Sequence, residues 1–278
     1  MRSVAINVVL SSPVGGFIVV CGLILGSFLN VCIYRLPLGI FWQSSRSFCP
    51  SCQKTIPFYY NIPVLSYLIL RGRSACCQAR ISPAYPLVEL FTAFGLAVIY
   101  AKFPFLGLHL APLQFSPDQG LRFLHGALLF AYFVTLSGID IKHRIIPDVL
   151  SIPMLLLSLV MMAIHPELDF RSGLIGIVAG ALVVYAISWA YYLVRRSEGM
   201  GFGDVKLLAV IGGWLGYQAI LPTLFLGSIA GSLVGLMVMV ATKQYRLNLE
   251  VPFGPFLALG AMSHYLFSEE LRQFFVYP

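Results

Sequence analysis

Charge is scarce in this chain. Only 10% of its 278 residues are charged, whereas a soluble globular domain carries about 25%. Hydrophobic residues make up 59% and the mean hydropathy is +0.86, which is more apolar surface than one soluble core can bury. Internal repeats and low-complexity segments are also lacking. These absences exclude a soluble globular protein and predict an all-α polytopic membrane protein.

The apolar segments predict how often the chain crosses the membrane. A span needs roughly 20 apolar residues, and several segments here are short or contain Gly and Pro, so seven or nine spans are alternatives to eight. The eight predicted spans are 13–34, 84–101, 121–139, 149–165, 172–194, 205–219, 221–241 and 253–268. The first lacks the small-residue cleavage site of a signal peptide, so we expect it to be retained as a helix.

The predicted division of the chain has three parts. They are a first transmembrane helix (1–35), a cytoplasmic loop domain (36–83) and a transmembrane helical domain (84–278).

The basic residues predict the orientation of the spans, because Lys and Arg gather on the cytoplasmic side. With the amino terminus outside, 13 of the 18 basic residues fall in cytoplasmic segments. They are Arg35, Arg46, Lys54, Arg71, Arg73, Arg80, Lys142, Arg144, Arg195, Arg196, Lys206, Lys243 and Arg246. The basic residues that give the net charge of +7 are therefore sorted by membrane side. We expect the lipid bilayer, and not nucleic acid, as a partner.

A carboxylate follows two glycines in the stretch "GMGFGDVKLL". Asp204 could be the N-cap of the next helix, where its side chain would accept backbone N–H bonds. An N-cap needs no preceding Gly-x-Gly, however, and Gly201 and Gly203 allow close approaches that other residues forbid. At membrane depth, irregular backbone persists only where protein or water covers it. The stretch thus indicates either a helix cap or a functional site.

Two further carboxylates occur in "GIDIKHRIIPD". Asp148 lies at the start of the next span, where an acid complements the helix dipole, so we expect a structural role. Asp140 lies at the opposite kind of helix end, where the dipole does not favour it. It is either a solvated carboxylate paired with Lys142 or Arg144, or part of a site.

Two aspartates at one membrane face suggest a specific chemistry. Paired carboxylates that share a proton can activate water and protonate a leaving amine, because their proximity pushes the two titrations apart. Asp140 and Asp204 can lie at one depth and on one side of the membrane, as an aspartic protease would require.

The predicted cytoplasmic loop contains four cysteines. Cys49 and Cys52 form a CxxC pair, which is half of a structural zinc site. Cys76 and Cys77 are the candidates for the other two ligands, although adjacent cysteines bind one metal less readily than a second CxxC pair. A reducing cytoplasmic location argues against disulfides. The alternatives are a zinc site and reduced thiols without a metal.

Five motifs follow one another along nearly the whole chain: "GSFLNVCIYRLP", the CPxC loop, "ISPAYPLVEL", "GIDIKHRIIPD" and "GFGDVKLL". In this order and on this topology, the chain resembles the bacterial type IV prepilin peptidases. These are bifunctional leader peptidases and N-methyltransferases within the GxGD aspartic membrane proteases. The resemblance implies that Asp140 and Asp204 are the catalytic pair. It also implies that Gly201, Gly203 and Lys206 support the active-site loop.

The resemblance further implies a reaction and its setting. The substrate would be a type IV prepilin or a type II secretion pseudopilin, with a short basic leader before a hydrophobic helix. The cut would fall after a glycine at the cytoplasmic face of the bacterial inner membrane. S-adenosylmethionine would then methylate the new amino terminus. The peptidase domain would be the transmembrane part (84–278), and we expect no metal in its catalytic site.

The cysteine loop departs from the family pattern. Members with four loop cysteines have two CxxC pairs, and the second pair would fall at positions 74 and 77, but Ser74 occupies the first of these. Either Cys76 replaces the missing ligand or the zinc site is incomplete. Some members lack these cysteines, so peptidase activity need not depend on them.

The methyl-transfer site is less marked in the sequence. A Rossmann-type glycine-rich loop after a strand is absent, which excludes a soluble methyltransferase domain. We expect the cofactor at the junction of the loop and the membrane helices. Asn30 and Glu89 flank the loop as buried polar residues, for which a helix–helix hydrogen bond is the favoured role.

Two alternative functions stay open. The first is a GxGD intramembrane protease of the presenilin and signal-peptide-peptidase type, without methyltransferase activity. The CPxC loop and "GFGDVKLL" favour the prepilin group over it. The second is a membrane transporter in which the aspartates bind cations.

Overall fold

The structure, a computed structural model, describes residues 12–42, 46–106, 115–165, 169–196, 201–242 and 252–270. The regular elements of these residues are helices, and extended pairing is limited to isolated β-bridges. The chain forms two compact units, Met1–Thr135 and Leu136–Pro278. The prediction of an all-α protein is therefore confirmed.

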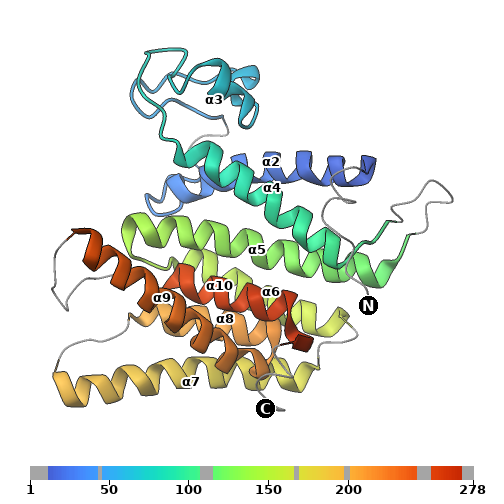
Figure 1. The fold of residues 1–278 in the computed structure, drawn as a ribbon, viewed down its shortest axis with the longest axis vertical. Coiled ribbons are helices and arrows are strands. Elements are labelled where there is room, and N and C mark those ends of the chain that lie inside the picture. Colours follow the sequence, from blue (N-terminus) through green and yellow to red (C-terminus); the bar gives the residue numbers. More distant parts are fainter. Residues whose placement is uncertain are drawn as a thin grey trace. The chain divides into compact units, whose positions relative to one another are not determined.

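The helices lie where the spans were predicted, and each helix end differs from its prediction by only a few residues (Figure 1). The helices are α2 (Pro13–Arg35), α4 (Ala84–Lys102), α5 (Pro117–His143), α6 (Asp148–Ile164), α7 (Phe170–Arg195), α8 (Phe202–Leu215), α9 (Ile220–Thr242) and α10 (Gly254–Leu266). Shorter elements are η1 (Phe58–Asn61) and α3 (Leu65–Ile69) in the loop, and η2 (Tyr217–Ala219) before α9.

Five helical segments of the described residues are long and apolar enough to cross a membrane. They are Pro13–Arg35, Ala84–Lys102, Pro117–His143, Phe170–Val194 and Tyr217–Ala241. The protein is therefore a multi-pass membrane protein. Helices α6, α8 and α10 have 17, 14 and 13 residues. At 1.5 Å per residue they fall short of a hydrocarbon core of about 30 Å, so eight crossings stay a prediction.

In the first unit, α2 and α4 lie side by side because glycines let their backbones approach closely (Figure 1). A Cβ atom added at Gly22 would lie 2.5 Å from the Cα of Ala93, and one added at Gly26 would lie 2.6 Å from the Cα of Glu89. Small residues at helix crossings have this role in membrane proteins. The side chain of Asn30 adds a hydrogen bond to the backbone of α4, as predicted for it.

In the second unit, α8 is buried between neighbouring helices. Its residues from Leu207 to Trp214 are all buried. Gly212 allows the contact with α7, because a Cβ atom there would lie 2.0 Å from the backbone oxygen of Gly176. The indole of Trp214 donates a 2.9 Å hydrogen bond to the backbone oxygen of Met154 in α6. Helix α8 is therefore fixed by α6 and α7, and so is its first turn.

This packing predicts unequal effects of two glycine substitutions. We expect Gly212→Ala to lower the free energy of unfolding by about 1–3 kcal/mol, because overpacking forces α7 and α8 apart. Gly235→Ala in α9 should be neutral or slightly stabilising, because no atom lies within 4 Å of the added Cβ and Ala favours the helix. Thermal unfolding of both purified variants in detergent measures the difference. Equal midpoints would contradict the close approach of α7 and α8.

Candidate functional site

Asp140 lies in the last turn of α5, and its side chain is only 5% exposed. Its Oδ2 atom accepts a 3.0 Å hydrogen bond from the backbone N–H of Gly254, the first residue of α10. The alternative of a solvated carboxylate is therefore wrong. The carboxylate is enclosed by protein, and the start of α10 fixes its orientation.

Gly254 itself was not predicted as part of the site. A Cβ atom at this position would lie 2.7 Å from Asp140 Oδ2 and 3.1 Å from the Leu136 side chain. Only glycine leaves room for the carboxylate here. The sequence does contain a pattern that predicts a helix start here. It is the "PFGP" stretch (252–255), in which Pro255 follows Gly254 in the first turn of the helix.

Asp204 lies in the first turn of α8 and not at its N-cap. The N-cap residue is Gly201, whose backbone oxygen accepts a 3.0 Å hydrogen bond from the N–H of Asp204. The alternative in which Asp204 caps the helix is thus wrong, although an acid in the first turn still complements the helix dipole.

The two glycines before Asp204 differ in their surroundings. A Cβ atom at Gly203 would lie 3.0 Å from the Cβ of Ile146, which precedes α6. The close approach of Ile146 therefore explains why position 203 is glycine. At Gly201 the nearest atom would be 3.9 Å away and φ is −69°, so neither space nor backbone angle requires glycine there.

The structure brings Asp140 and Asp204 together from segments 64 residues apart in the sequence, since the two carboxylates interact electrostatically. Both belong to the Leu136–Pro278 unit. Asp140 is buried and Asp204 is half-buried. The two carboxylates thus belong to one site of the second unit.

Lys206 and Asp148 form an ion pair that joins α8 to α6. The ammonium group of Lys206 also lies 5.0 Å from the centre of the Phe202 ring. Asp148 is in the first turn of α6, as predicted for a structural role. Lys206 thus links α8 to the start of α6.

The four loop cysteines gather in one cluster in the first unit. Their sulfur atoms all lie within 4.8 Å of one another. Cys49 Sγ is 3.7 Å from Cys77 Sγ, and Cys52 Sγ is 3.1 Å from Cys76 Sγ. Zinc–sulfur bonds of 2.3 Å in a tetrahedral site place sulfurs about 3.8 Å apart. The donor set and spacing therefore fit zinc, with Cys76 as the fourth ligand.

Ser74 occupies the position of the missing family cysteine but contacts the same sulfurs. Its hydroxyl donates to Cys49 Sγ at 3.5 Å and lies 3.0 Å from Cys76 Sγ. The hydrogen bond from Ser74 lowers the pKa of the Cys49 thiol to about 6. The interaction with Cys76 raises the pKa of Cys52 to about 12. A metal that binds here must therefore displace protons, chiefly from Cys52.

Glu89 has two partners near the loop. Its carboxylate accepts a 2.7 Å hydrogen bond from the backbone N–H of Val64. It also accepts one from the Ser27 hydroxyl in α2. The predicted helix–helix hydrogen bond is thus present, and the contact with Val64 additionally ties the loop to α4.

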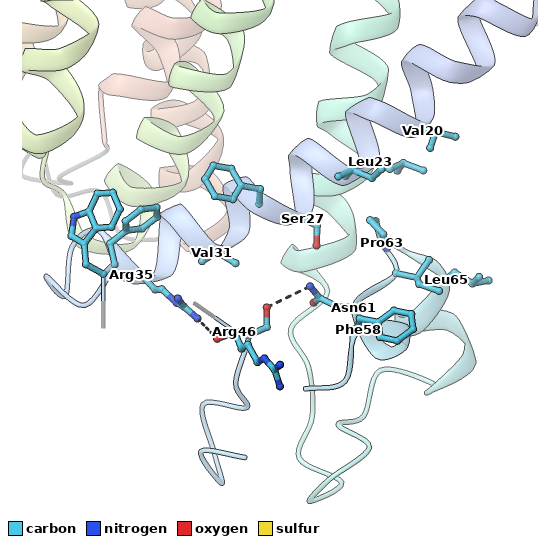
Figure 2. A pocket seen from close by; sticks show the side chains of 16 residues that line it. Val20, Leu23, Ser27, Val31, Arg35, Arg46, Phe58, Asn61, Pro63 and Leu65 are labelled. Carbon is cyan, nitrogen blue, oxygen red and sulfur yellow. Dashed lines mark hydrogen bonds between the residues drawn. The ribbon is translucent and has the colours of Figure 1, made fainter. Parts of the chain in front are cut away.

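A pocket of about 970 Å³ lies between α2 and the loop of the first unit (Figure 2). Its walls are mostly apolar, and Arg35 and Arg46 lie at one end. Arg35 Nη2 donates a 2.8 Å hydrogen bond to the backbone oxygen of Arg46. The sequence contained no pattern that indicated this pocket, because its two walls come from separate segments.

Comparisons with known proteins agree with these features. The sequence profile described as "Bacterial Peptidase A24 N-terminal domain" matches residues 20–103, which include the four cysteines. The profile described as "Type IV leader peptidase family" matches residues 127–236, which include both aspartates.

Curated relatives resemble the chain over most of its length. The prepilin leader peptidase/N-methyltransferase of Aeromonas hydrophila is 36% identical over 278 residues and covers 91% of each chain. That of Stutzerimonas stutzeri is 35% identical and covers 91% of this chain and 90% of its own. That of Dickeya chrysanthemi is 38% identical, with 87% and 88% covered. No solved structure matches the chain. With both profiles and these relatives in agreement, the chain belongs to the type IV leader peptidase family.

Proposed function

We propose that this protein is a prepilin leader peptidase and N-methyltransferase. It removes the leader of type IV prepilins or pseudopilins after a glycine and then methylates the new amino terminus. The observation that carries the proposal is the electrostatic interaction between Asp140 and Asp204 in a chain whose relatives bear this name.

The aspartate pair would act as a general acid and a general base. The ionised carboxylate takes a proton from water, and the resulting hydroxide attacks the scissile carbonyl carbon. The protonated carboxylate then gives its proton to the leaving amine as the C–N bond breaks. The hydrogen bond from Gly254 would hold Asp140 in the orientation that this transfer needs.

The proposed topology has eight spans, with the amino terminus outside and the aspartates at the cytoplasmic face of the inner membrane. The sorting of the basic residues supports it. The proposed division keeps a first helix (1–35), a cytoplasmic loop domain (36–83) and a peptidase domain (84–278). The cysteine cluster belongs to the loop domain in this division.

Two cofactors belong to the proposal. Zinc would be held by the four loop cysteines, Cys49, Cys52, Cys76 and Cys77, as a structural ion. S-adenosylmethionine would supply the methyl group. The pocket beside the loop fits this cofactor poorly, because the cofactor carries two positive groups and one carboxylate. The pocket lining contributes Arg35 and Arg46, and the described residues that form it include no acid. Like charges would oppose binding, so no step of methyl transfer is placed there.

Mass spectrometry of a prepilin peptide tests the function. We expect the purified protein with S-adenosylmethionine to remove the leader and add one methyl group. Cleavage without the methyl group would favour a GxGD protease that lacks methyltransferase activity. An intact peptide, with well-folded protein and several prepilin peptides tried, would contradict the proposal.

The aspartate pair predicts the effect of isosteric substitutions. Asp140→Asn and Asp204→Asn should each lower the cleavage rate by about 10²–10⁴-fold, the usual contribution of a general acid or base, with little loss of folded protein. Asp169→Asn is the matched control. Asp169 caps α7, and Asn caps helices equally well, so cleavage should be unchanged. Cleavage at the normal rate in either pair variant would contradict the assignment.

The contact of α10 with the pair predicts that Gly254→Ala impairs catalysis. The added Cβ atom would displace the Asp140 carboxylate, and misplacement of a catalytic group by about 1 Å can cost 10²-fold in rate. We expect a fall in kcat of about 10–100-fold, measured by peptide cleavage on folded protein. An unchanged kcat would show that the position of α10 does not matter for the reaction.

The cysteine cluster predicts zinc content. We expect one zinc ion per chain by elemental analysis, less in Cys76→Ser, and the full amount in Cys21→Ser, since Cys21 lies in α2 outside the cluster. Ser74→Ala should weaken zinc binding by about 10–100-fold through loss of its contact with the sulfurs. Cleavage should survive in these variants while the loop becomes less stable. Equal zinc content in Cys76→Ser and Cys21→Ser would contradict a four-cysteine site.

A further inference from the structure

The pocket between α2 and the loop has an apolar wall provided by one face of a membrane helix. Residues of α2 line it at intervals of three or four positions, which places them in one row along the helix. The row consists of one polar residue, Ser27, among the apolar residues Val20, Leu23, Ile24, Phe28 and Val31. Figure 2 shows Val20, Leu23, Ser27 and Val31 following one another along the helix toward Arg35.

The opposite wall comes from the loop and is also apolar. Phe58, Pro63 and Leu65 face the helix across the pocket (Figure 2), and Phe58 is 85% exposed. Exposed apolar groups of this size indicate a surface that something apolar covers. Among the described residues, the pocket thus has two mostly apolar walls.

The loop wall is anchored to α2 and α4 through Glu89. Its backbone makes a γ-turn centred on Val64, with φ +60°, in which the N–H of Leu65 donates to the backbone oxygen of Pro63. Positive φ is a strained conformation for a β-branched residue. The carboxylate of Glu89 accepts the Val64 N–H and also binds Ser27. The pocket is therefore a built feature of the first unit.

The length of the apolar row matches one leaflet of a bilayer. Val20 and Val31 are 11 residues apart, which at 1.5 Å per residue is about 16 Å along the axis. Half of a hydrocarbon core of about 30 Å is about 15 Å. An acyl chain of one leaflet would therefore fill the row from Val31 to Val20.

The charged end of the pocket begins where the apolar row stops. Arg35 lies one turn beyond Val31, and its side chain is 6% exposed. Arg46 is exposed beside it. The residues of the described chain that line the pocket include no carboxylate. Two guanidinium groups beside an apolar row suit an amphiphile with a phosphate head group.

We propose that this pocket binds an anionic phospholipid from the leaflet at the basic end of α2, with an acyl chain along the α2 row and the phosphate at Arg35 and Arg46. In the predicted topology this is the cytoplasmic leaflet, whose anionic lipids attract basic side chains. A prepilin would be a poorer occupant of the same place, because its basic leader would meet the two arginines. The proposal does not depend on the peptidase activity.

Quenching of Trp42 fluorescence by brominated lipids tests the proposal. Trp42 lines the pocket and is 89% exposed, and the difference between the protein and its Trp42→Phe variant isolates its signal. The full-length protein is titrated in micelles with acyl-brominated phosphatidylglycerol or with acyl-brominated phosphatidylcholine. We expect the anionic lipid to quench Trp42 at a concentration about fivefold lower for each arginine that contacts the phosphate.

Three variants test whether the charge of Arg46, and not a change in folding, causes the preference for the anionic lipid. Arg46→Gln should reduce the preference for phosphatidylglycerol about fivefold, and Arg46→Lys should retain it. Arg171→Gln, at an exposed position of α7, should behave as the unsubstituted protein. Equal quenching by the two lipids, or an unchanged preference in Arg46→Gln, would overturn the proposal. Release of the quenching by a prepilin peptide would also overturn it, since substrate would then be the occupant.

Discussion

A carboxylate within a membrane protein is costly unless protein or water surrounds it, and the second unit of this chain is arranged around two of them. Asp140 is enclosed at the end of α5 by the first residues of α10. Asp204 sits in the first turn of α8, a helix too short to span a bilayer alone. Because α6 and α7 pack against α8 through Met154 and Gly176, that short helix can begin at the second carboxylate. The short helices and the close glycine contacts both follow from the need to surround these carboxylates with protein.

The cysteine cluster of the loop also depends on support from neighbouring groups. The cluster lacks the cysteine that the family spacing would place at position 74, yet Cys76 brings a fourth sulfur to it. Ser74 keeps a hydrogen bond to Cys49 from the original position. Cys76 thus supplies a sulfur to the cluster, and Ser74 supplies a hydrogen bond. The loop can therefore keep four sulfur donors despite the altered motif.

The positions of the helices could be predicted from the sequence, because apolar runs of about 20 residues are a strong local signal. The choice of Asp140 and Asp204 as a pair came from the family resemblance, because the residues alone left a helix cap and a solvated carboxylate open, and their catalytic role stays a prediction. The contact of Gly254 with Asp140 could not be predicted, because it joins residues 114 positions apart and a single glycine carries no pattern. The burial of Asp140 was also missed, since the nearby Lys142 and Arg144 offered it equally good partners in the sequence. One wall of the pocket contains a γ-turn at Val64. The sequence around Val64 has no residue pattern that predicts such a turn.

The meeting of Asp140 and Asp204 can be measured directly by cross-linking. Cysteines are placed at both positions in the full-length protein, and membranes are treated with a short bifunctional thiol reagent. Proteolysis and mass spectrometry then identify the linked peptides, which differ in mass from those of the native cysteines. A protein with cysteines at 169 and 204 is the control, since Asp169 lies at the start of α7, away from the pair. The account predicts an intramolecular link between 140 and 204 and none between 169 and 204. Absence of the 140–204 link, with both cysteines accessible to the reagent singly, would contradict it.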